Sequence, residues 1–193
     1  MIKKIDYFRS LAEKTLSLKR LKHTLGVEVT AIELAGIHGV DTEAASLAAL
    51  AHDLAKKIPL EEQLEMAEKW NLIWYPEDRE NLQVLHGRIA AYMIKNEHGI
   101  NDKDILNAVA NHTLGRPGMS RLEMIIYSAD LVEPNRDFSQ VDNLRKKLYD
   151  DLVVGTFLCV EHTLTHLKNS NKIPHPLTLE TYKDLKKLLL NQD

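Results

Sequence analysis

The sequence is poor in cysteine, glycine and aromatic residues, and each shortage excludes a class of protein. Its 193 residues include a single cysteine, Cys159, so an internal disulfide is excluded. Only eight glycines and a 6% share of aromatic residues argue against a β-sandwich or barrel. Because Cys159 lies in an apolar stretch, we expect it to pack in the core. A lone thiol also points to a reducing compartment, and we expect a cytoplasmic protein.

Long apolar runs and blocks of one charge are also missing. No stretch approaches the roughly 18 apolar residues that a membrane span needs. The first 14 residues lack the apolar core of a signal peptide. The net charge is −3 and no basic block occurs, so an electrostatic nucleic-acid surface is not indicated. We therefore expect neither membrane nor nucleic acid among the partners.

What the sequence does contain is apolar residues at helical spacing along almost its whole length. With 44% apolar and 27% charged residues, the composition suits one sizeable globular domain. Asp41 is the expected N-cap of one helix, and Pro59 is expected to stop it. No segment alternates as a strand does, and no linker divides the chain, so we predict a single all-α domain over residues 1–193. The helices are expected at about 5–16, 21–35, 42–57, 60–70, 81–98, 102–112, 119–132, 140–149, 152–168 and 179–190.

The dipeptide His52-Asp53 stands out, because it lies in the small, apolar, helical stretch 46–56. An imidazole beside a carboxylate is expensive to bury unless something binds both. A metal cation would do so, since these two ligand types suit zinc, iron and manganese. The alternative is an ordinary core histidine that is capped by its neighbour.

Four further ligand-type side chains are each alone in an apolar helical context. Singly, each is better read as a core histidine or a surface aspartate. Together with His52-Asp53 they form the order His, His-Asp, His, His, Asp along the chain, which is harder to attribute to packing. These four are His23, His86, His112 and Asp130.

This order resembles the HD-domain metal-dependent phosphohydrolases, an all-α family. The flanking residues make the resemblance more specific and are similar to the YqeK family of symmetric diadenosine tetraphosphatases, from about residue 17 to residue 183. The matching motifs are Arg20-x-x-His23, His52-Asp53-x-x-Lys56, His86-Gly87, His112-Thr113-x-Gly115, Ala129-Asp130-x-x-Glu133-Pro134-x-Arg136 and Ile173-Pro174-His175-Pro176-x-Thr178.

The resemblance implies a helical bundle with its metal site in about 17–137 and nucleotide-contacting elements in about 138–193. It implies His23, His52, Asp53 and Asp130 as primary metal ligands. His86 and His112 either complete a second metal site that Asp53 bridges, or contact phosphate and position water beside a single ion. The family implies iron, with manganese or cobalt as substitutes, and the ligand types leave zinc open. The absence of thiolate ligands argues against a structural zinc site.

Cationic side chains accompany these ligands. Lys56 lies three residues after Asp53, and Arg20 three before His23, so each shares a helical face with a ligand and would reach a bound phosphate. Arg136 and the hydroxyl or amide of Thr113 are further phosphate contacts, and Arg116 is a weaker one. For Lys56, Arg116 and Arg136 the alternative is an ordinary solvated surface.

The late segment of the chain is expected to contact the nucleoside. By resemblance these contacts come from Ile173, Pro174, His175, Pro176 and Thr178. The alternative is a plain connection that is stiffened by its prolines. The pair His162 and His166 has a spacing that binds metals, but no catalytic glutamate follows it, and we expect surface exposure or packing there. Trp70, Trp74 and Tyr75 are expected to form a satellite apolar cluster.

The expected activity is metal-dependent hydrolysis of diadenosine tetraphosphate to two ADP, in which a hydroxide generated at the metal attacks a phosphorus of the central anhydride. The resemblance assigns catalysis to Asp53, Lys56, His86 and His112. It places substrate against them and against Arg20, Thr113, Asp130 and Arg136. Two alternatives stay open, namely another nucleotide as substrate and a non-enzymatic nucleotide sensor or helical module. The resemblance is also compatible with a homodimer.

Overall fold

The computed structural model describes residues 1–191, and within them every regular element is helical. This confirms the predicted all-α class. Among the described residues, no helix combines the length and apolar character that a membrane span requires. The α-helices are α1 (Ile2–Thr15), α2 (Leu18–Ile37), α3 (Thr42–Ala51), α4 (Leu60–Lys69), α5 (His86–Asn96), α6 (Lys103–Asn111), α7 (Arg121–Val132), α8 (Val141–Asp150), α9 (Leu152–Asn169) and α10 (Pro176–Leu190), with short 3₁₀ turns η1 (Pro76–Asp78) and η2 (Leu82–Val84).

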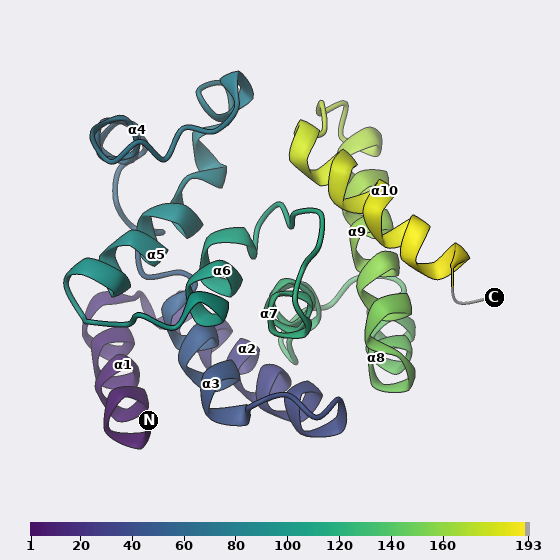
Figure 1. The fold of residues 1–193 in the computed structure, drawn as a ribbon, viewed down its shortest axis with the longest axis horizontal. Coiled ribbons are helices and arrows are strands. Elements are labelled where there is room, and N and C mark those ends of the chain that lie inside the picture. Colours follow the sequence, from purple (N-terminus) through teal and green to yellow (C-terminus); the bar gives the residue numbers. More distant parts are fainter. Residues whose placement is uncertain (192–193) are drawn as a thin grey trace.

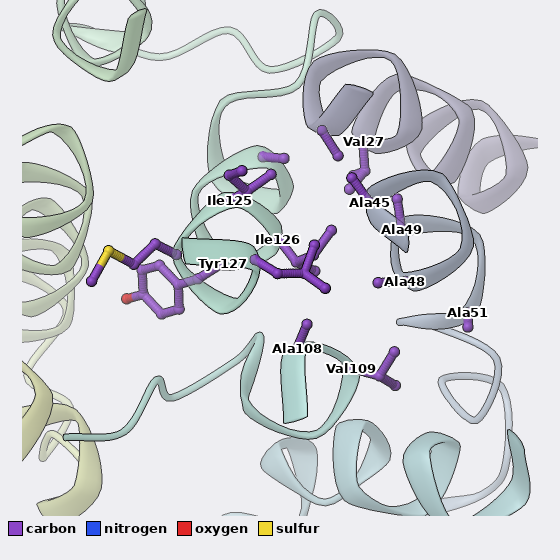
Figure 2. Close-up of a cluster of buried hydrophobic side chains, with 14 of the residues drawn as sticks. Val27, Ala45, Ala48, Ala49, Ala51, Ala108, Val109, Ile125, Ile126 and Tyr127 are labelled. Atoms are coloured by element: carbon purple, nitrogen blue, oxygen red, sulfur yellow. The ribbon is translucent and has the colours of Figure 1, made fainter. Parts of the chain in front are cut away.

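The short, alanine-rich helix α3 lies at the centre of the packing. Every residue from Ala44 to Ala51 is buried, and α3 contacts α1, α2, α5, α6 and α7. Figure 2 shows its alanines facing Val27 of α2, Val109 of α6 and Ile126 of α7. Alanine side chains are small enough for these helices to approach closely on several sides. The residues that follow α3 therefore emerge in the interior of the molecule.

Helix α3 begins as predicted and ends earlier than predicted. The Asp41 carboxylate accepts hydrogen bonds from the Glu43 and Ala44 amides, which confirms it as the N-cap. The expected continuation to residue 57 is wrong, because regular α-geometry stops at Ala51. Three-residue turns replace it, with Leu54 N–H bonded to Ala51 O and Lys56 N–H to Asp53 O. Such turns contain fewer residues per turn than an α-helix, so the angle between successive side chains is larger. His52 and Asp53 both face inward.

Two other boundaries shift in the same way. The expected helix 81–98 is divided into η2 and α5, and α5 begins at His86 itself. Helix α10 begins at Pro176 and not near residue 179, because the His175 side chain accepts a hydrogen bond from the Leu177 amide and caps it. Proline at the first helical position needs no amide partner.

Helices α8, α9 and α10 gather on one side of the molecule, across α7 from α3 (Figure 1). The connection between α6 and α7 reaches over to α10. There the Gly118 amide donates to Asp184 Oδ2 at 2.8 Å, and Gly115, at φ +68°, packs against Thr181. A side chain at Gly115 would collide with Thr181, so this contact requires glycine.

The expected satellite cluster of Trp70, Trp74 and Tyr75 is wrong, because the three side chains pack in different places around the segment between α4 and α5. Trp70 stacks on Tyr92 with ring centroids 4.1 Å apart. The Trp74 ring lies 4.1 Å below the Arg88 guanidinium. The third aromatic side chain, Tyr75, packs beside Val84.

A buried carboxylate, Asp78, connects this segment to α5 and α10. It is fully buried and accepts hydrogen bonds from the Trp74 and Tyr75 amides. Arg88 Nη1 lies 2.6 Å from Oδ2, and His175 Nε2 lies 3.1 Å from Oδ1. Burial alone would raise the pKa of Asp78, but the Arg88 guanidinium and the two amides outweigh it and lower that pKa.

Replacement of Asp78 by asparagine leaves the buried Arg88 without a counter-charge. We expect Asp78→Asn to lower the free energy of unfolding by about 3 kcal/mol or more, measured by urea denaturation at pH 7. The exposed pair of Asp142 and Arg145 supplies the control, and Asp142→Asn is expected to cost less than about 1 kcal/mol. Equal effects of the two variants would contradict a structural role for Asp78.

The lowered pKa also gives a pH window. Its stabilisation is complete above the unfolded-state pKa of about 3.9 and is lost as pH falls towards the lower folded value. As pH falls below about 4, the wild type should therefore lose stability more steeply than Asp78→Asn.

Candidate metal centre

Six side chains from five parts of the chain converge beside the end of α3. All except Asp130, whose side chain is 27% exposed, are almost completely buried. Asp53 lies in the middle, with Oδ2 at 3.4 Å from His52 Nε2 and Oδ1 at 3.3 Å from His86 Nε2. The six are the predicted ligands His23, His52, Asp53, His86, His112 and Asp130, and two overlapping subsets of them have metal-binding spacing.

All four histidines use Nδ1 for a hydrogen bond to a protein oxygen that lies behind them. Three of them donate to the backbone carbonyl three residues earlier. Because a carbonyl can only accept, the proton lies on Nδ1 and the Nε2 lone pair faces the cluster. The bonds are His52 to Ala49 (2.6 Å), His86 to Gln83 (2.7 Å), His112 to Val109 (2.8 Å) and His23 to the Glu133 carboxylate (3.2 Å).

The inward-facing atoms are too close to one another to be stable by themselves. His23 Nε2 lies 2.9 Å from Asp130 Oδ1, and His86 Nε2 lies 3.0 Å from His112 Nε2. With Nδ1 of both rings protonated, His86 and His112 bring two Nε2 lone pairs together, which repel unless a cation or proton lies between them. His23 and Asp130 do the same when the His23 proton lies on Nδ1. The buried Nε2 atoms of His23 and His52 have no hydrogen-bond partner. Imidazole nitrogens and carboxylate oxygens of this kind fit a divalent metal such as iron, manganese or zinc.

The electrostatics of the cluster favour positive charge at its centre. Burial would raise the pKa values of Asp53 and Asp130, but the surrounding histidines outweigh it and hold both carboxyls ionised. Burial opposes a charge on His52 as well, yet Asp53 outweighs it and raises the pKa of His52. Burial and the neighbouring His86 lower the pKa of His112 to about 3, so this ring is neutral at pH 7.

Glu133 supports the cluster from behind, a role that was not assigned from the sequence. It is 2% exposed, and its Oε1 accepts from His23 while its Oε2 accepts from the Asn135 amide at 2.7 Å. A Cβ atom at Gly26 would lie 2.4 Å from Oε2, so the carboxylate fits only against a glycine. In the sequence Glu133 belongs to the motif that begins at Ala129, but no role follows from it there, and nothing marks Gly26 as its neighbour.

A second glycine sets the distance between His86 and His112. A Cβ atom at Gly87 would lie 2.9 Å from the Ala110 carbonyl and 3.1 Å from the His112 ring. Helices α5 and α6 therefore pack closely at this point, which brings the two imidazoles together. The motif His86-Gly87 thus places a ligand beside the glycine that lets it reach its neighbour.

Three of the predicted phosphate contacts surround the cluster. Arg20 Nη1 lies 2.8 Å from Asp53 Oδ2, and Arg136 Nη2 lies 3.1 Å from Asp130 Oδ1. Lys56 Nζ lies 3.4 Å from His86 Nδ1, and burial lowers the pKa of Lys56. A fourth predicted contact, Thr113, is also present, with its hydroxyl 3.2 Å from His112 Nε2.

Arg116 is placed elsewhere. Its Nε and Nη2 bind both oxygens of the buried Glu123 at 2.7 and 2.6 Å, which anchors the loop before α7. This engagement leaves Arg116 as a structural residue.

The late segment 173–178 lies near the cluster, but its side chains are used unevenly. Leu177 packs with Val84 and Leu114, each two residues from a ligand histidine. Both ring nitrogens of His175 are already bonded within the protein. Pro174 and Pro176 are half-buried, Thr178 is buried and Ile173 is 92% exposed.

Comparison with known proteins points in one direction. The HD domain family matches residues 20–135, which include all six candidate ligands. The symmetrical bis(5'-nucleosyl)-tetraphosphatase of Bacillus subtilis is 39% identical over 170 residues, 88% of this chain and 91% of that protein. The protein of the same name from Halalkalibacterium halodurans is 38% identical and covers 91% of this chain and 93% of its own.

A solved structure agrees with this match. It is a crystal structure from Clostridium acetobutylicum, described as a predicted HD superfamily hydrolase involved in NAD metabolism. It is 40% identical to this chain, covers 94% of it and 96% of its own chain, and superposes with a TM-score of 0.90.

Replacement of Gly87 by alanine should separate His86 from His112. The added methyl group meets backbone carbonyl oxygens, so α5 has to move away from α6. We expect Gly87→Ala to reduce bound metal, measured by elemental analysis, and to lower stability by about 1–3 kcal/mol. Gly36 in α2 is the control, because a Cβ there meets nothing within 4 Å and Gly36→Ala should leave metal content unchanged. Full metal occupancy in Gly87→Ala would show that the close approach is unnecessary.

Replacement of Glu133 by glutamine removes the charge behind His23. We expect Glu133→Gln to weaken metal affinity about 10- to 100-fold, measured by competition with a chelator. Glu28→Gln is the matched control, since Glu28 is equally buried but pairs with Arg9 and Ser46. That control should lose stability and keep metal affinity. Wild-type affinity in Glu133→Gln would mean that Glu133 only packs.

Proposed function

The chain belongs to the HD-domain family, and from that membership we propose that it hydrolyses diadenosine tetraphosphate symmetrically to two ADP. The observation that carries the proposal is the set of inward-facing imidazole and carboxylate ligands, with three cations around it. A phosphohydrolase requires both features, because phosphoryl transfer depends mainly on positioning and on charge stabilisation.

HD domains hold divalent metal ions, and His23, His52, Asp53 and Asp130 would hold one here. His86 and His112 would complete a second site with Asp53, or would face the substrate beside a single ion. A bound metal ion lowers the pKa of water towards neutrality and neutralises phosphate oxygens. We propose iron, with manganese, cobalt or zinc as substitutes in the same ligand set.

The cations can bind the polyphosphate while they orient the ligands. Arg20 and Arg136 each use part of the guanidinium on a carboxylate, and their side chains are 35% and 40% exposed. Their remaining N–H groups are thus available to phosphate oxygens. Lys56 places a third positive charge beside His86. A polyanionic substrate would otherwise be repelled by Asp53 and Asp130.

The placement of these cations suits cleavage at a central anhydride. Arg20 binds the Asp53 side of the cluster and Arg136 the Asp130 side, so phosphates on both sides of the reacting phosphorus find a counter-charge. Lys56 would stabilise negative charge on the departing ADP. Thr113, with its hydroxyl beside His112, would donate to a phosphate oxygen.

We also propose that segment 173–178 contacts one nucleoside, from Ile173 to Thr178. Since the His175 ring is bonded to Asp78 and Leu177, its contact would come from the backbone. The exposed Ile173 side chain offers an apolar cover for a base. The homodimer and the cytoplasmic location stay predictions from the sequence.

Product identification tests the activity. Metal-loaded protein is expected to convert diadenosine tetraphosphate to ADP alone, measured by ion-exchange chromatography. ATP plus AMP would indicate asymmetric cleavage, and inorganic phosphate would indicate a different bond. If the protein turns over neither this nor any other nucleotide while a control hydrolase is active in the same assay, the result would favour the alternative of a non-enzymatic nucleotide sensor.

Two substitutions separate metal binding from phosphate binding. Asp53→Ala should abolish activity and lower metal content together, because Asp53 is central to the ligand set. Lys56→Ala should keep the metal and lower kcat about 10²-fold, as expected for loss of one transition-state charge contact. The exposed neighbour supplies the control, and Lys57→Ala should behave as wild type. Full activity in Asp53→Ala would show that the site is wrongly placed.

A further inference from the structure

A cavity of about 340 Å³ opens beside the metal ligands and extends towards α9. One wall contains His112, Asp130 and Arg136, which belong to the centre described above. The opposite wall contains Phe138 and His162, which have no role so far. This volume is at the lower end of the range for small-molecule pockets, which begins at about 300 Å³. We call this space the α9 cavity.

The far wall is suited to a flat aromatic group. The rings of Phe138 and His162 are stacked, with centroids 4.6 Å apart and an angle of 27° between their planes. Burial and the nearby His166 lower the pKa of His162, so its ring is neutral at pH 7. A nucleobase stacks well on aromatic and imidazole side chains of this kind.

The α9 cavity also contains a polar group that lacks a partner. Tyr127 lines it and is 4% exposed, and its hydroxyl has no partner in good hydrogen-bond geometry, with Thr163 as its polar neighbour. Figure 2 shows the Tyr127 ring pointing from α7 away from the alanines of α3, towards the C-terminal helices. Burial raises the pKa of this hydroxyl, so it stays protonated and able to donate. A buried hydroxyl without a partner is costly, and a ligand that accepts from it would remove that cost.

Phosphate groups have a better place on the other side of the centre. A separate groove of about 440 Å³ is lined by Lys19, Arg20 and Lys22, and Arg136 borders both spaces. Positive charge therefore gathers in this groove, which Glu133 also lines, and aromatic surface gathers in the α9 cavity. A polyphosphate that lies in the groove and ends in a nucleoside in the α9 cavity would pass from one space to the other at Arg136.

From these observations we infer that the α9 cavity binds one purine nucleoside of the substrate, with His162 and Phe138 as the stacking surface and Tyr127 as a hydrogen-bond donor. The inference rests on the proposed function and deepens it. No residue of segment 173–178 lines the α9 cavity, so it is a different place from that segment. A substrate with two identical nucleosides, cleaved at its middle, needs two such places.

The test compares His162→Ala and Tyr127→Phe with wild type and with Thr165→Ala, an exposed substitution on α9 outside the α9 cavity. For diadenosine tetraphosphate we expect His162→Ala to raise KM about tenfold, as expected for a lost stacking contact, with kcat within about threefold. Tyr127→Phe, which keeps the ring and removes only the hydroxyl, should raise KM about threefold or more. Thr165→Ala should match wild type, and circular dichroism checks that each variant folds.

Inorganic tetraphosphate, which has no nucleoside, separates base binding from phosphate binding. Its inhibition constant should be the same for wild type and His162→Ala. A parallel rise in this constant and in KM would mean that the α9 cavity holds phosphate, and would overturn the inference.

Calorimetric titration with ADP gives a readout that does not require turnover. We expect wild type to bind two ADP per chain and His162→Ala to lose or weaken one of them about tenfold. If wild type binds ADP in this way but does not cleave the substrate, the proposed function fails while the nucleoside site stands. If His162→Ala and Tyr127→Phe bind ADP and substrate as wild type does, the nucleoside site is overturned.

Discussion

The site depends on four hydrogen bonds that point away from it. Each ligand histidine gives its Nδ1 proton to an oxygen behind it, three times a carbonyl of the preceding turn and once the Glu133 carboxylate. These bonds fix the tautomers and turn the Nε2 lone pairs towards Asp53 and Asp130. This group of acceptors is energetically unfavourable by itself, because the lone pairs of neighbouring acceptor atoms repel one another at hydrogen-bond distance. Positive charge at the centre removes that cost, and the same charge is what a phosphohydrolase needs.

Close helix packing makes this convergence geometrically feasible. The alanines of α3 let its neighbours surround it, so that the end of α3 lies among α2, α5, α6 and α7. Gly87 allows α5 to approach α6, and Gly26 leaves room for Glu133. In each case a missing side chain sets the distance between two polar groups. In the sequence these small helical residues indicate only that a position is buried. In the structure they determine the geometry of the centre.

The N-terminal helices α2 to α7 and the C-terminal helices α8 to α10 contribute different parts of the site. Helices α2 to α7 and their connections supply every candidate ligand. The far wall of the α9 cavity comes from α9 and from Phe138 before α8, and segment 173–178 leads into α10. Asp78 joins the parts, because it binds Arg88 of α5 and His175 at the start of α10. The His175 ring caps α10 and lies within hydrogen-bond distance of Asp78, so the substrate contact proposed for this residue comes from its backbone, and its position orients the segment around it.

The sequence by itself determined the helical class, most of the helices and all six candidate ligands. These follow from local rules, namely apolar periodicity, capping by Asp41, and ligand-type side chains that are alone on apolar faces. Tertiary structure decided where α3 ends, that Glu133 lies behind His23, that Arg116 is tied to Glu123, and that His162 faces a cavity shared with Asp130. Each of these depends on residues distant in the chain or on how helices cross, and no local pattern encodes such contacts. Physical proximity between helices, not spacing along the chain, turns six scattered side chains into one site.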